Sequence, residues 1–492
     1  MTLPLSLSFT HLKRARHAWR RTAALLSLAL LCTACAEPPE GPPATPDMVK
    51  GTAARLLPMP EGTPATSRAA QLAGTGHTEE EWVLTGSARR YAPAGAWARD
   101  GRWALNVISA PEPYRTRLLV RRPADPRRFN GMVVVEWLNT TLGFELDGGW
   151  VLTREELVRE GYAWVGVSAE PDSAKGLQTL QPARYAAQHI ASKALAYDVF
   201  TQAGEAVRAH ADQLLGSAKR PTLLAMGYSQ SAVFLTTYLN AFQPLSRTYQ
   251  GFLLHGSAPA AGPVLDGDSG QLLPRIRPDL GTPVMQVQTE MEVSVSWSLS
   301  HTADTPHVRY WEVAGAAHLD HRMQDEAMVV GPASFRDQAP SCLKPGNTLP
   351  TEVVDHAALH ALRRWVSEGV PPPTVPRLQR NALGFVQSDA DGNALGGLRL
   401  PELAQPLAQY GMYSNVPTAS LSVPSIYLCV AGGSTNPWDA GQLAARHGDR
   451  NRWLAAHRAQ ADALRDVGLM RPADHAASLA RAQAQRWPEN HP

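Results

Sequence analysis

One short segment of the chain has the residue types and the setting of an activated serine. Gly227-Tyr228-Ser229-Gln230-Ser231 lies between an apolar run typical of a strand and a stretch typical of a helix. A serine at such a turn presents its hydroxyl at the top of a sheet, and small neighbours let the strand and the helix approach closely. Ser231 stands where the G-x-S-x-G pattern has its last glycine, and it is also small. We therefore predict that Ser229 is a nucleophile; the alternative is a serine that only caps the helix.

A serine hydroxyl needs a base that accepts its proton and an acid that orients this base. His318 lies in a loop of small residues after a predicted strand, and His321 is its competitor for the role of base. Glu292 and Glu290 follow the preceding predicted strand. Counting from the end of that strand favours Glu292 as the acid and leaves Glu290 as the alternative. The chain thus carries serine, acid and histidine in this order, each after a strand.

Negative charge that develops on a carbonyl oxygen needs two backbone N–H donors. The amide of Gln230, the residue after the nucleophile, is predicted to be one of them. The second is predicted in the loop after the strand that ends at Leu138, at Asn139 or Thr140. A polar turn explains either of these two residues equally well, so both stay candidates.

The elements that must position these residues alternate between short apolar strands and helical stretches. Strand-like runs occur at residues 81–84, 103–107, 117–120, 133–138, 163–167, 222–226, 252–254, 284–287 and 308–313. Helical patterns occupy residues 194–210, 232–239 and 356–368. This alternation predicts a doubly wound, mostly parallel α/β sheet.

The catalytic domain is predicted to span residues 76–375. Three segments leave its strands at the edge that carries the candidate site, and we expect them to form a composite cap: 170–193, 256–282 and 321–350. Residues 376–492 are predicted to form a C-terminal extension packed on this domain. Its first part, to residue 436, is strand-poor and turn-rich, and residues 438–487 have a helical pattern.

Composition and charge exclude several classes of protein. The chain has 492 residues, of which 44% are hydrophobic, with 46 basic against 44 acidic side chains. This hydrophobic content is too high for a disordered protein. The near-zero net charge argues against nucleic acid as a partner, because phosphate binding needs a concentrated basic face. No apolar run of about 18 residues occurs, so no permanent membrane span is predicted.

The N-terminus has the layout of an export signal. A basic region precedes the apolar stretch 23–31, and small residues follow it. We predict a signal peptide over residues 1–34 and a proline-rich tether over residues 35–75. Cleavage before Cys35 would leave a cysteine that can carry a lipid anchor; cleavage after Ala36 is the alternative. The expected location is the cell envelope as a lipoprotein, or a secreted or periplasmic form.

Cys342 and Cys429 are the two cysteines outside the signal region. In an oxidising compartment they are expected to form one disulfide, and two separate buried thiols are the alternative. Neither has a cysteine or histidine neighbour at metal-ligand spacing. Asp389-Ala390-Asp391-Gly392-Asn393 lacks the closing glutamate of a calcium loop and is predicted to be a tight turn. We therefore expect no metal, and a serine mechanism requires no cofactor.

The chain contains several sequence motifs in the order in which they occur in a bacterial family usually called alpha/beta hydrolase domain-containing proteins, which it therefore resembles. These proteins are relatives of carboxylesterases. The resemblance runs from about residue 79 to about residue 482 and rests on residues 113–123, 134–139, 227–231, 288–290, 314–318 and 389–397. It implies the α/β-hydrolase fold and a serine hydrolase mechanism. The family has an Asp-like position where this chain has Glu292, so the chain departs from the pattern there. The likeness implies no substrate, because one fold hosts many chemistries.

The sequence thus predicts an exported serine hydrolase that cleaves a small-molecule carboxylic ester through an acyl-enzyme on Ser229, with Glu292 and His318. An acyltransferase or peptidase with the same three residues is one alternative. A non-catalytic surface lipoprotein that uses the fold as a binding module is the other. Contact with a membrane is expected only through a lipid anchor at Cys35.

Overall fold

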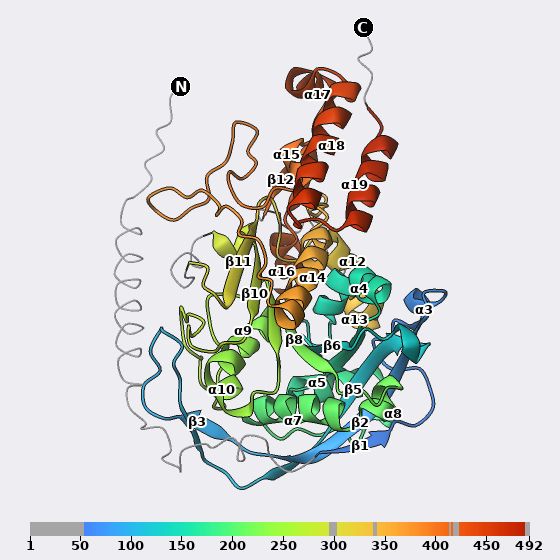
Figure 1. The fold of residues 1–492 in the computed structure, drawn as a ribbon, viewed down its shortest axis with the longest axis vertical. Coiled ribbons are helices and arrows are strands. Elements are labelled where there is room, and N and C mark those ends of the chain that lie inside the picture. Colours follow the sequence, from blue (N-terminus) through green and yellow to red (C-terminus); the bar gives the residue numbers. More distant parts are fainter. Residues whose placement is uncertain (1–53, 295–302, 338–341, 413–414, 417–422, 488–492) are drawn as a thin grey trace, which may run out of the picture. The chain divides into compact units, whose positions relative to one another are not determined.

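A mixed β-sheet runs through the computed structural model of the chain. The structure describes residues 54–294, 303–337, 342–412, 415–416 and 423–487. The strands of this sheet are β1 (Arg55–Pro58), β2 (His77–Ala88), β5 (Glu112–Pro123), β6 (Met132–Trp137), β7 (Ala163–Val167), β8 (Thr222–Tyr228), β9 (Gly251–His255), β10 (Val284–Thr289) and β11 (Val308–Val313). Their order is β1-β2-β5-β7-β6-β8-β9-β10-β11 (Figure 1). Neighbours from β7 to β11 in this order are parallel, whereas β1, β2, β5 and β7 pair antiparallel.

Helices cover both faces of the sheet, which confirms the predicted doubly wound α/β architecture. On β6, the side chain of Glu136 accepts the first amides of one helix, whereas the ring of Trp137 packs on aromatic side chains of two others. Consecutive strand residues point to opposite faces. The helix on the first face is α4 (Gly148–Glu160), against which α14 (Glu352–Glu368) packs, and those on the second are α7 (Ala196–Ala209) and α9 (Gln230–Thr237).

Most predicted strands lie in the large sheet, because they are apolar runs that the helices bury. β6 is an example: all six of its residues are buried. The predicted strand 103–107 differs, since β4 (Leu105–Val107) pairs with β3 (Tyr91–Pro93) in a separate two-stranded sheet. Helix α14 ends where predicted, at Gly369, which adopts the left-handed conformation with φ 69°.

Shorter helices fill the connections between these elements. They are α3 (Ala69–Leu72), η1 (Pro126–Arg128), α5 (Pro171–Leu180), α6 (Pro182–Tyr185), η2 (Lys193–Leu195), α8 (Ala211–Leu215), η3 (Tyr238–Phe242), α10 (Gln243–Ser246), α11 (Glu290–Val293), α12 (His321–Val330) and α13 (Ala333–Arg336). Within the described ranges, no helix combines the length and the apolar character that a bilayer crossing requires.

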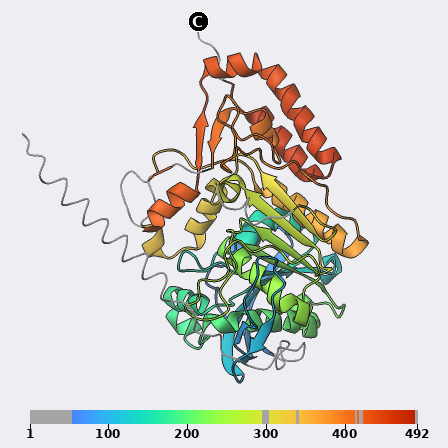
Figure 2. The same ribbon diagram turned by 90° about the vertical axis from the view of Figure 1, so that its left-hand side faces the viewer.

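The C-terminal extension continues from the sheet edge at β11. Its elements are α15 (Pro401–Ala404), β12 (Ala408–Gly411), α16 (Val423–Ala431), β13 (Ser434–Pro437), α17 (Ala440–His447), α18 (Arg450–Asp466) and α19 (Pro472–Ala484) (Figure 2). Leu398 bridges to Val313 of β11, and Arg380 lies 2.9 Å from Glu312. The helical pattern predicted over 438–487 is confirmed, whereas the β12-β13 pair and α16 were not predicted.

The segment around Asp389 is the predicted tight turn. Oδ1 of Asp389 accepts hydrogen bonds from the amides of Asp391 and Asn393 at 3.0 and 2.9 Å. Gly392 between them has φ 80°, a conformation that glycine adopts without steric cost. The carboxylate of Asp389 therefore stabilises the backbone of its own turn.

The N-terminal segment differs from the predicted tether over its second part. The predicted signal peptide, Cys35 and the first part of the tether, up to residue 53, lie outside the described residues. From residue 54 the chain belongs to the folded body: β1 pairs antiparallel with β2, and the side chain of Arg68 is fully buried. Tertiary ion pairs cause this difference, and local composition does not reveal them.

A buried ion cluster joins this segment to the sheet and to α4. Asp147 lies 2.8 Å from Arg68 and 2.6 Å from Arg121. Arg68 also pairs with Glu326 at 2.6 Å, and Arg121 pairs with Glu79 at 2.8 Å. Burial by itself would raise the pKa of Asp147, but the two guanidinium groups lower it to about 2. Without this carboxylate, two buried cations would lose a shared partner.

We expect Asp147→Asn to lower the free energy of unfolding by about 3–5 kcal/mol at neutral pH, because it leaves buried charge uncompensated. The pKa of Asp147 is about 2 in the folded protein, below the value of about 3.9 in an unfolded chain. Its contribution is therefore present above about pH 4 and is lost as the pH falls through about 2. Urea unfolding at several pH values measures both effects.

Asp466→Asn is the matched control for this prediction, because Asp466 is an exposed carboxylate that pairs with Arg465. Exposed pairs contribute little to stability. The control should leave both the unfolding free energy and its pH dependence unchanged. Equal losses in the two variants would contradict a stabilising role of the buried cluster.

Candidate active site

The turn between β8 and α9 holds Ser229 in a backbone conformation that few non-glycine residues adopt. Its φ is 58° and its ψ is −121°, and such conformations cost about 1–3 kcal/mol. The amide of Ser229 donates to the carbonyl of His255, and its own carbonyl accepts the amide of Val233. A Cβ at Gly227 would lie 2.8 Å from the backbone nitrogen of Ala232. The strand and the helix thus enforce the turn, and the glycine permits their close approach.

Three predicted residues meet beyond the carboxyl ends of β8, β10 and β11. Oγ of Ser229 lies 2.8 Å from Nε2 of His318, and Nδ1 of His318 lies 2.5 Å from Oε1 of Glu292. The second carboxylate oxygen of Glu292 accepts the amide and the hydroxyl of Thr289 at 3.0 and 2.5 Å. Each carboxylate oxygen therefore has its own partner. With Nδ1 of His318 donating to Glu292, Nε2 can accept the serine proton.

The two candidate acids, Glu290 and Glu292, have different hydrogen-bond partners in the structure. Oε2 of Glu290 accepts the amide of Gly315 at 2.7 Å, so Glu290 supports the loop that leads to His318. Burial raises the pKa of Glu290 to about 7 despite that hydrogen bond. Burial also acts to raise the pKa of Glu292, but the charge of His318 and its hydrogen bond outweigh this effect, and the pKa is lowered. Glu292 is therefore the carboxylate that is held ionised against the imidazole.

The loop between β6 and α4 lies against Gln230. Gln230 is the first residue of α9, where amides lack partners within the helix. The amide of Thr140 lies 3.3 Å from the side-chain oxygen of Gln230. The amide of Asn139 donates to the carbonyl of Leu146 and so closes its own loop. The Thr140 amide thus faces the side chain of Gln230, whereas the Asn139 amide is used within its own loop.

A buried carboxylate fixes the side chain of Gln230. Oε1 of Glu170 accepts from Nε2 of Gln230 at 2.7 Å and from the indole of Trp137 at 3.0 Å. Burial raises the pKa of Glu170, and these two hydrogen bonds and the charge of Lys193 only partly oppose that rise. Glu170 therefore orients the amide group of Gln230, whose oxygen in turn receives the Thr140 amide.

Tyr228, the last residue of β8, supports His318 through its ring and its hydroxyl. Its ring stacks with that of His318 at 5.4 Å and with that of His255 at 5.6 Å, and its hydroxyl donates to the His318 carbonyl. His255 is itself bonded to buried Asp355 at 2.8 Å. Ser231 is also buried, and its Oγ bonds to both the amide and the carbonyl of Tyr228. The hydroxyl of Ser231 therefore explains why serine replaces the last glycine of the motif.

Apolar side chains from several segments pack around this site. The partly buried ones that share a cluster with Tyr228 are Leu142, Leu180, Met291, Met328 and Tyr427. Leu180 and Met328 come from two of the predicted cap segments, 170–193 and 321–350. The segment 256–282 begins at Gly256, where a Cβ would lie 3.3 Å from Nδ1 of His318. Tyr427 belongs to α16, which was not predicted to take part in the cap.

The disulfide predicted between Cys342 and Cys429 is present, with a Cα–Cα distance of 5.4 Å. It links the segment after α13 to α16. The amide of Leu319, directly after His318, donates to the carbonyl of Ala431 at 2.8 Å. Helix α16 is therefore attached both to the predicted cap and to the loop of the histidine.

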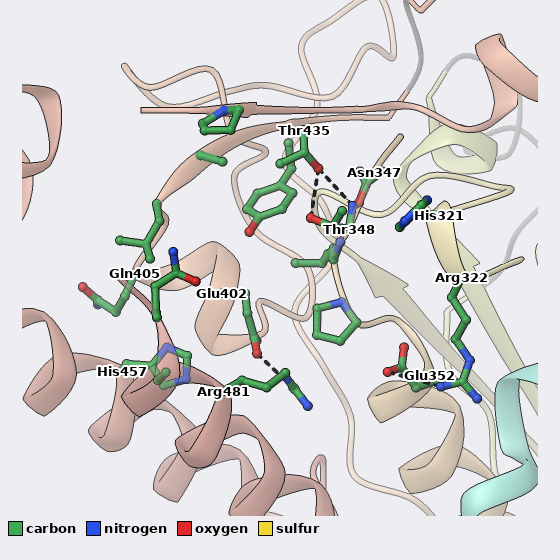
Figure 3. Close-up of a pocket in the computed structure, with 18 of the residues that line it drawn as sticks. His321, Arg322, Asn347, Thr348, Glu352, Glu402, Gln405, Thr435, His457 and Arg481 are labelled. Atoms are coloured by element: carbon green, nitrogen blue, oxygen red, sulfur yellow. Dashed lines mark hydrogen bonds and ion pairs between the residues drawn. The ribbon is translucent and has the colours of Figure 1, made fainter. Parts of the chain in front are cut away.

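A separate cavity of about 650 Å³ lies between α12, α15, the β12-β13 pair, α18 and α19 (Figure 3). Its wall includes His321, Glu402 and Arg481, and Ser229 is not part of it. The side chain of His321 is largely exposed and pairs with Asp325 at 3.5 Å. The competitor of His318 therefore belongs to this cavity and does not contact the serine.

Two residues of the site have sequence signals that strand counting does not use. Thr289-Glu290-Met291-Glu292 has the form of a capping box, which assigns the side chain of Glu292 to Thr289 and so distinguishes it from Glu290. Tyr427 stands two residues before Cys429, so the predicted disulfide already placed it near the cap. His255 and Glu170 carry no such signal, because only the tertiary structure brings their partners to them.

Comparison with known proteins agrees with this architecture. The pattern of a family described as an alpha/beta hydrolase domain matches residues 40–480 of the chain. No curated protein matches the chain.

Among solved structures, the chain is similar to esterase Est22, with 15% identity, a TM-score of 0.25 and coverage of 44% of this chain and 64% of that chain. It is similar to the rice cell wall degrading esterase LipA from Xanthomonas oryzae, with 15% identity, a TM-score of 0.23 and coverage of 45% and 51%. It is also similar to XC6422 from Xanthomonas campestris, a member of the α/β serine hydrolases without a lid, with 14% identity, a TM-score of 0.27 and coverage of 44% and 91%. The chain thus spans less than two thirds of Est22 and of LipA.

We expect Glu292→Gln to slow the reaction of Ser229 with a fluorophosphonate probe by roughly three orders of magnitude, because the amide no longer stabilises the imidazolium of His318. Glu290→Gln is the matched control, since Glu290 contacts the Gly315 amide instead. The control should react at nearly the rate of the unchanged protein. The measurement is the rate of probe incorporation over time. Equal rates for the two variants would contradict the assignment of Glu292.

Proposed function

The chain belongs to the alpha/beta hydrolase domain family, and from this premise we propose that it is a serine hydrolase that cleaves carboxylic esters. The observation that carries the proposal is the contact of Ser229 Oγ with Nε2 of His318 at 2.8 Å, while Glu292 holds the opposite ring nitrogen at 2.5 Å. Ser229 is also partly exposed, so a substrate can reach it. Acyl transfer requires a serine that is accessible to the substrate and hydrogen-bonded to a general base. Ser229 meets both conditions on its strained turn.

The proposed reaction begins with attack by Ser229. As Oγ bonds to the ester carbonyl carbon, its proton passes to Nε2 of His318 and the carbonyl π electrons move to the oxygen. Ionised Glu292 stabilises the imidazolium that forms. The C–O bond to the alcohol then breaks, and the departing oxygen takes the proton from His318. The acyl group remains on Ser229.

The oxyanion of the tetrahedral intermediate is received by the amides of Gln230 and Thr140. In the free protein the Thr140 amide points to the Gln230 side-chain oxygen at 3.3 Å, which is a long hydrogen bond. The developing negative charge replaces this weak acceptor with a stronger one. Such an exchange favours the transition state over the ground state, which is the requirement for catalysis.

Water completes the cycle in the second half of the reaction. His318 takes one proton from water as its oxygen bonds to the acyl carbon, and the bond to Oγ then breaks. Ser229 regains its proton from His318, and the carboxylic acid leaves. The cycle consumes one water molecule and requires no cofactor.

The apolar side chains around the serine support an ester with an apolar acyl or alcohol part. Leu142, Leu180, Met291 and Met328 are partly buried there. We also propose that the protein is exported, with or without a lipid on Cys35. The signal-peptide pattern supports export, and so does the Cys342–Cys429 disulfide, because such bonds persist in oxidising compartments.

We expect the unchanged protein to hydrolyse nitrophenyl esters of a chain-length series, and Ser229→Ala to lose this activity by at least about a thousandfold. A circular dichroism spectrum checks that the variant is folded. Hydrolysis of nitroanilides in preference to esters would indicate a peptidase, and transfer to an added alcohol in preference to water would indicate an acyltransferase. A folded unchanged protein that neither cleaves esters nor reacts with a fluorophosphonate probe would contradict the proposal and favour a binding module.

A further inference from the structure

Tyr427 of α16 reaches the reacting atoms from the C-terminal extension. Its hydroxyl lies close to the side chain of Ser229. Its ring meets that of His318 edge-on, with centroids 6.4 Å apart and planes at 72°. The mechanism proposed above assigns no role to this phenol. It is nevertheless a polar group that contacts both the nucleophile and the base.

Which of the two hydroxyls can donate to the other follows from the second partner of the serine. Ser229 has one hydroxyl proton, and Nε2 of His318 must accept it, because Nδ1 donates to Glu292. Between the two hydroxyls, the phenol of Tyr427 is therefore the available donor and a lone pair of Oγ is the available acceptor. Burial raises the pKa of Tyr427 above its usual value, so the donor keeps its proton at neutral pH.

Helix α16 is held at the site from several sides. The Cys342–Cys429 disulfide lies two residues from Tyr427 on the same helix. Ala431 accepts the amide of Leu319, and Leu428 and Ala431 are buried in the cluster that contains Tyr228. Tyr427 is thus presented by a covalently anchored element, which limits the entropy lost when it orders around a substrate.

We propose that Tyr427 is a catalytic residue that donates a hydrogen bond to the oxygens of the tetrahedral intermediate, and that the Cys342–Cys429 disulfide holds it in place for this role. This inference rests on the proposed ester hydrolysis. A donor that contacts Oγ before attack lies beside the oxygens that share the acyl carbon with Oγ afterwards. Tyr427 transfers no proton in this scheme: it strengthens its hydrogen bond as negative charge develops, and His318 carries the proton throughout.

Tyr427→Phe tests the first part, because it removes only the hydroxyl and keeps the ring. We expect kcat for a nitrophenyl ester to fall by about 100- to 1,000-fold with KM and the thermal unfolding temperature little changed, as for loss of one oxyanion donor. Tyr410→Phe is the matched control, since Tyr410 lies in the same extension but lines the cavity of Figure 3. It should retain full activity. A Tyr427→Phe variant with unchanged kcat overturns the proposal.

Reduction of the disulfide tests the second part. Reduction, or Cys342→Ser with Cys429→Ser, should lower kcat of the unchanged protein towards the value of Tyr427→Phe. The same treatment should change Tyr427→Phe itself much less, because two changes that act through one contact are not additive. Equal fractional losses in both backgrounds would overturn the link between the disulfide and Tyr427, since reduction would then act elsewhere.

These outcomes are distinct from failure of the proposed function. If the unchanged protein hydrolyses no ester and its Ser229 does not react with a fluorophosphonate, ester hydrolysis itself fails, and the role of Tyr427 fails with it. If the unchanged protein is active and Tyr427→Phe is equally active, the hydrolase stands and only the role of Tyr427 is lost.

Discussion

The imidazole of His318 must contact two side chains at once, and this requirement organises the centre of the molecule. Its two nitrogens lie 2.8 Å from Ser229 and 2.5 Å from Glu292. Ser229, Glu292 and His318 follow β8, β10 and β11. Their side chains can meet because the carboxyl ends of parallel strands lie at the same edge of a sheet. The strained turn of Ser229 is held by hydrogen bonds to His255 and Val233. The packed sheet thus holds Ser229 in a backbone conformation that is unfavourable by itself.

Buried charges also fix the loop between β6 and α4, which faces Gln230. The loop is closed by the backbone pair Asn139–Leu146 and is tied to the serine turn by the Asn139 side chain, which donates to the Tyr228 carbonyl at 2.9 Å. At its end, Asp147 is held by Arg68 and Arg121. The ion cluster therefore does more than join strands, since it fixes the loop that presents the amide of Thr140. The stability of the fold and the position of the Thr140 loop therefore depend on the same carboxylate.

The C-terminal extension reaches the surroundings of His318 through helix α16. Helix α16 places the ring of Tyr427 against that of His318, and its Ala431 carbonyl accepts the amide of the residue after His318. One disulfide is enough to anchor it, because Leu428 and Ala431 bury their side chains in the cluster around Tyr228. A family pattern that matches residues 40–480 includes this helix. The family pattern therefore covers the extension as well as the sheet.

The sequence by itself determined the α/β architecture, and it predicted the three side chains that meet in the structure, Ser229, His318 and Glu292, because strand periodicity, turn composition and chain order are local properties. It also identified the Cys342–Cys429 pair, since no other cysteines compete for it outside the signal region. Only the tertiary structure shows that the Asn139 amide pairs with Leu146 and the Thr140 amide with Gln230, because the partner of an amide depends on how its loop closes. It alone placed Arg68 in the body and Tyr427 beside His318, because both contacts join segments far apart in the chain. Periodicity reports which face of an element is buried, but it does not report which distant side chain lies against that face.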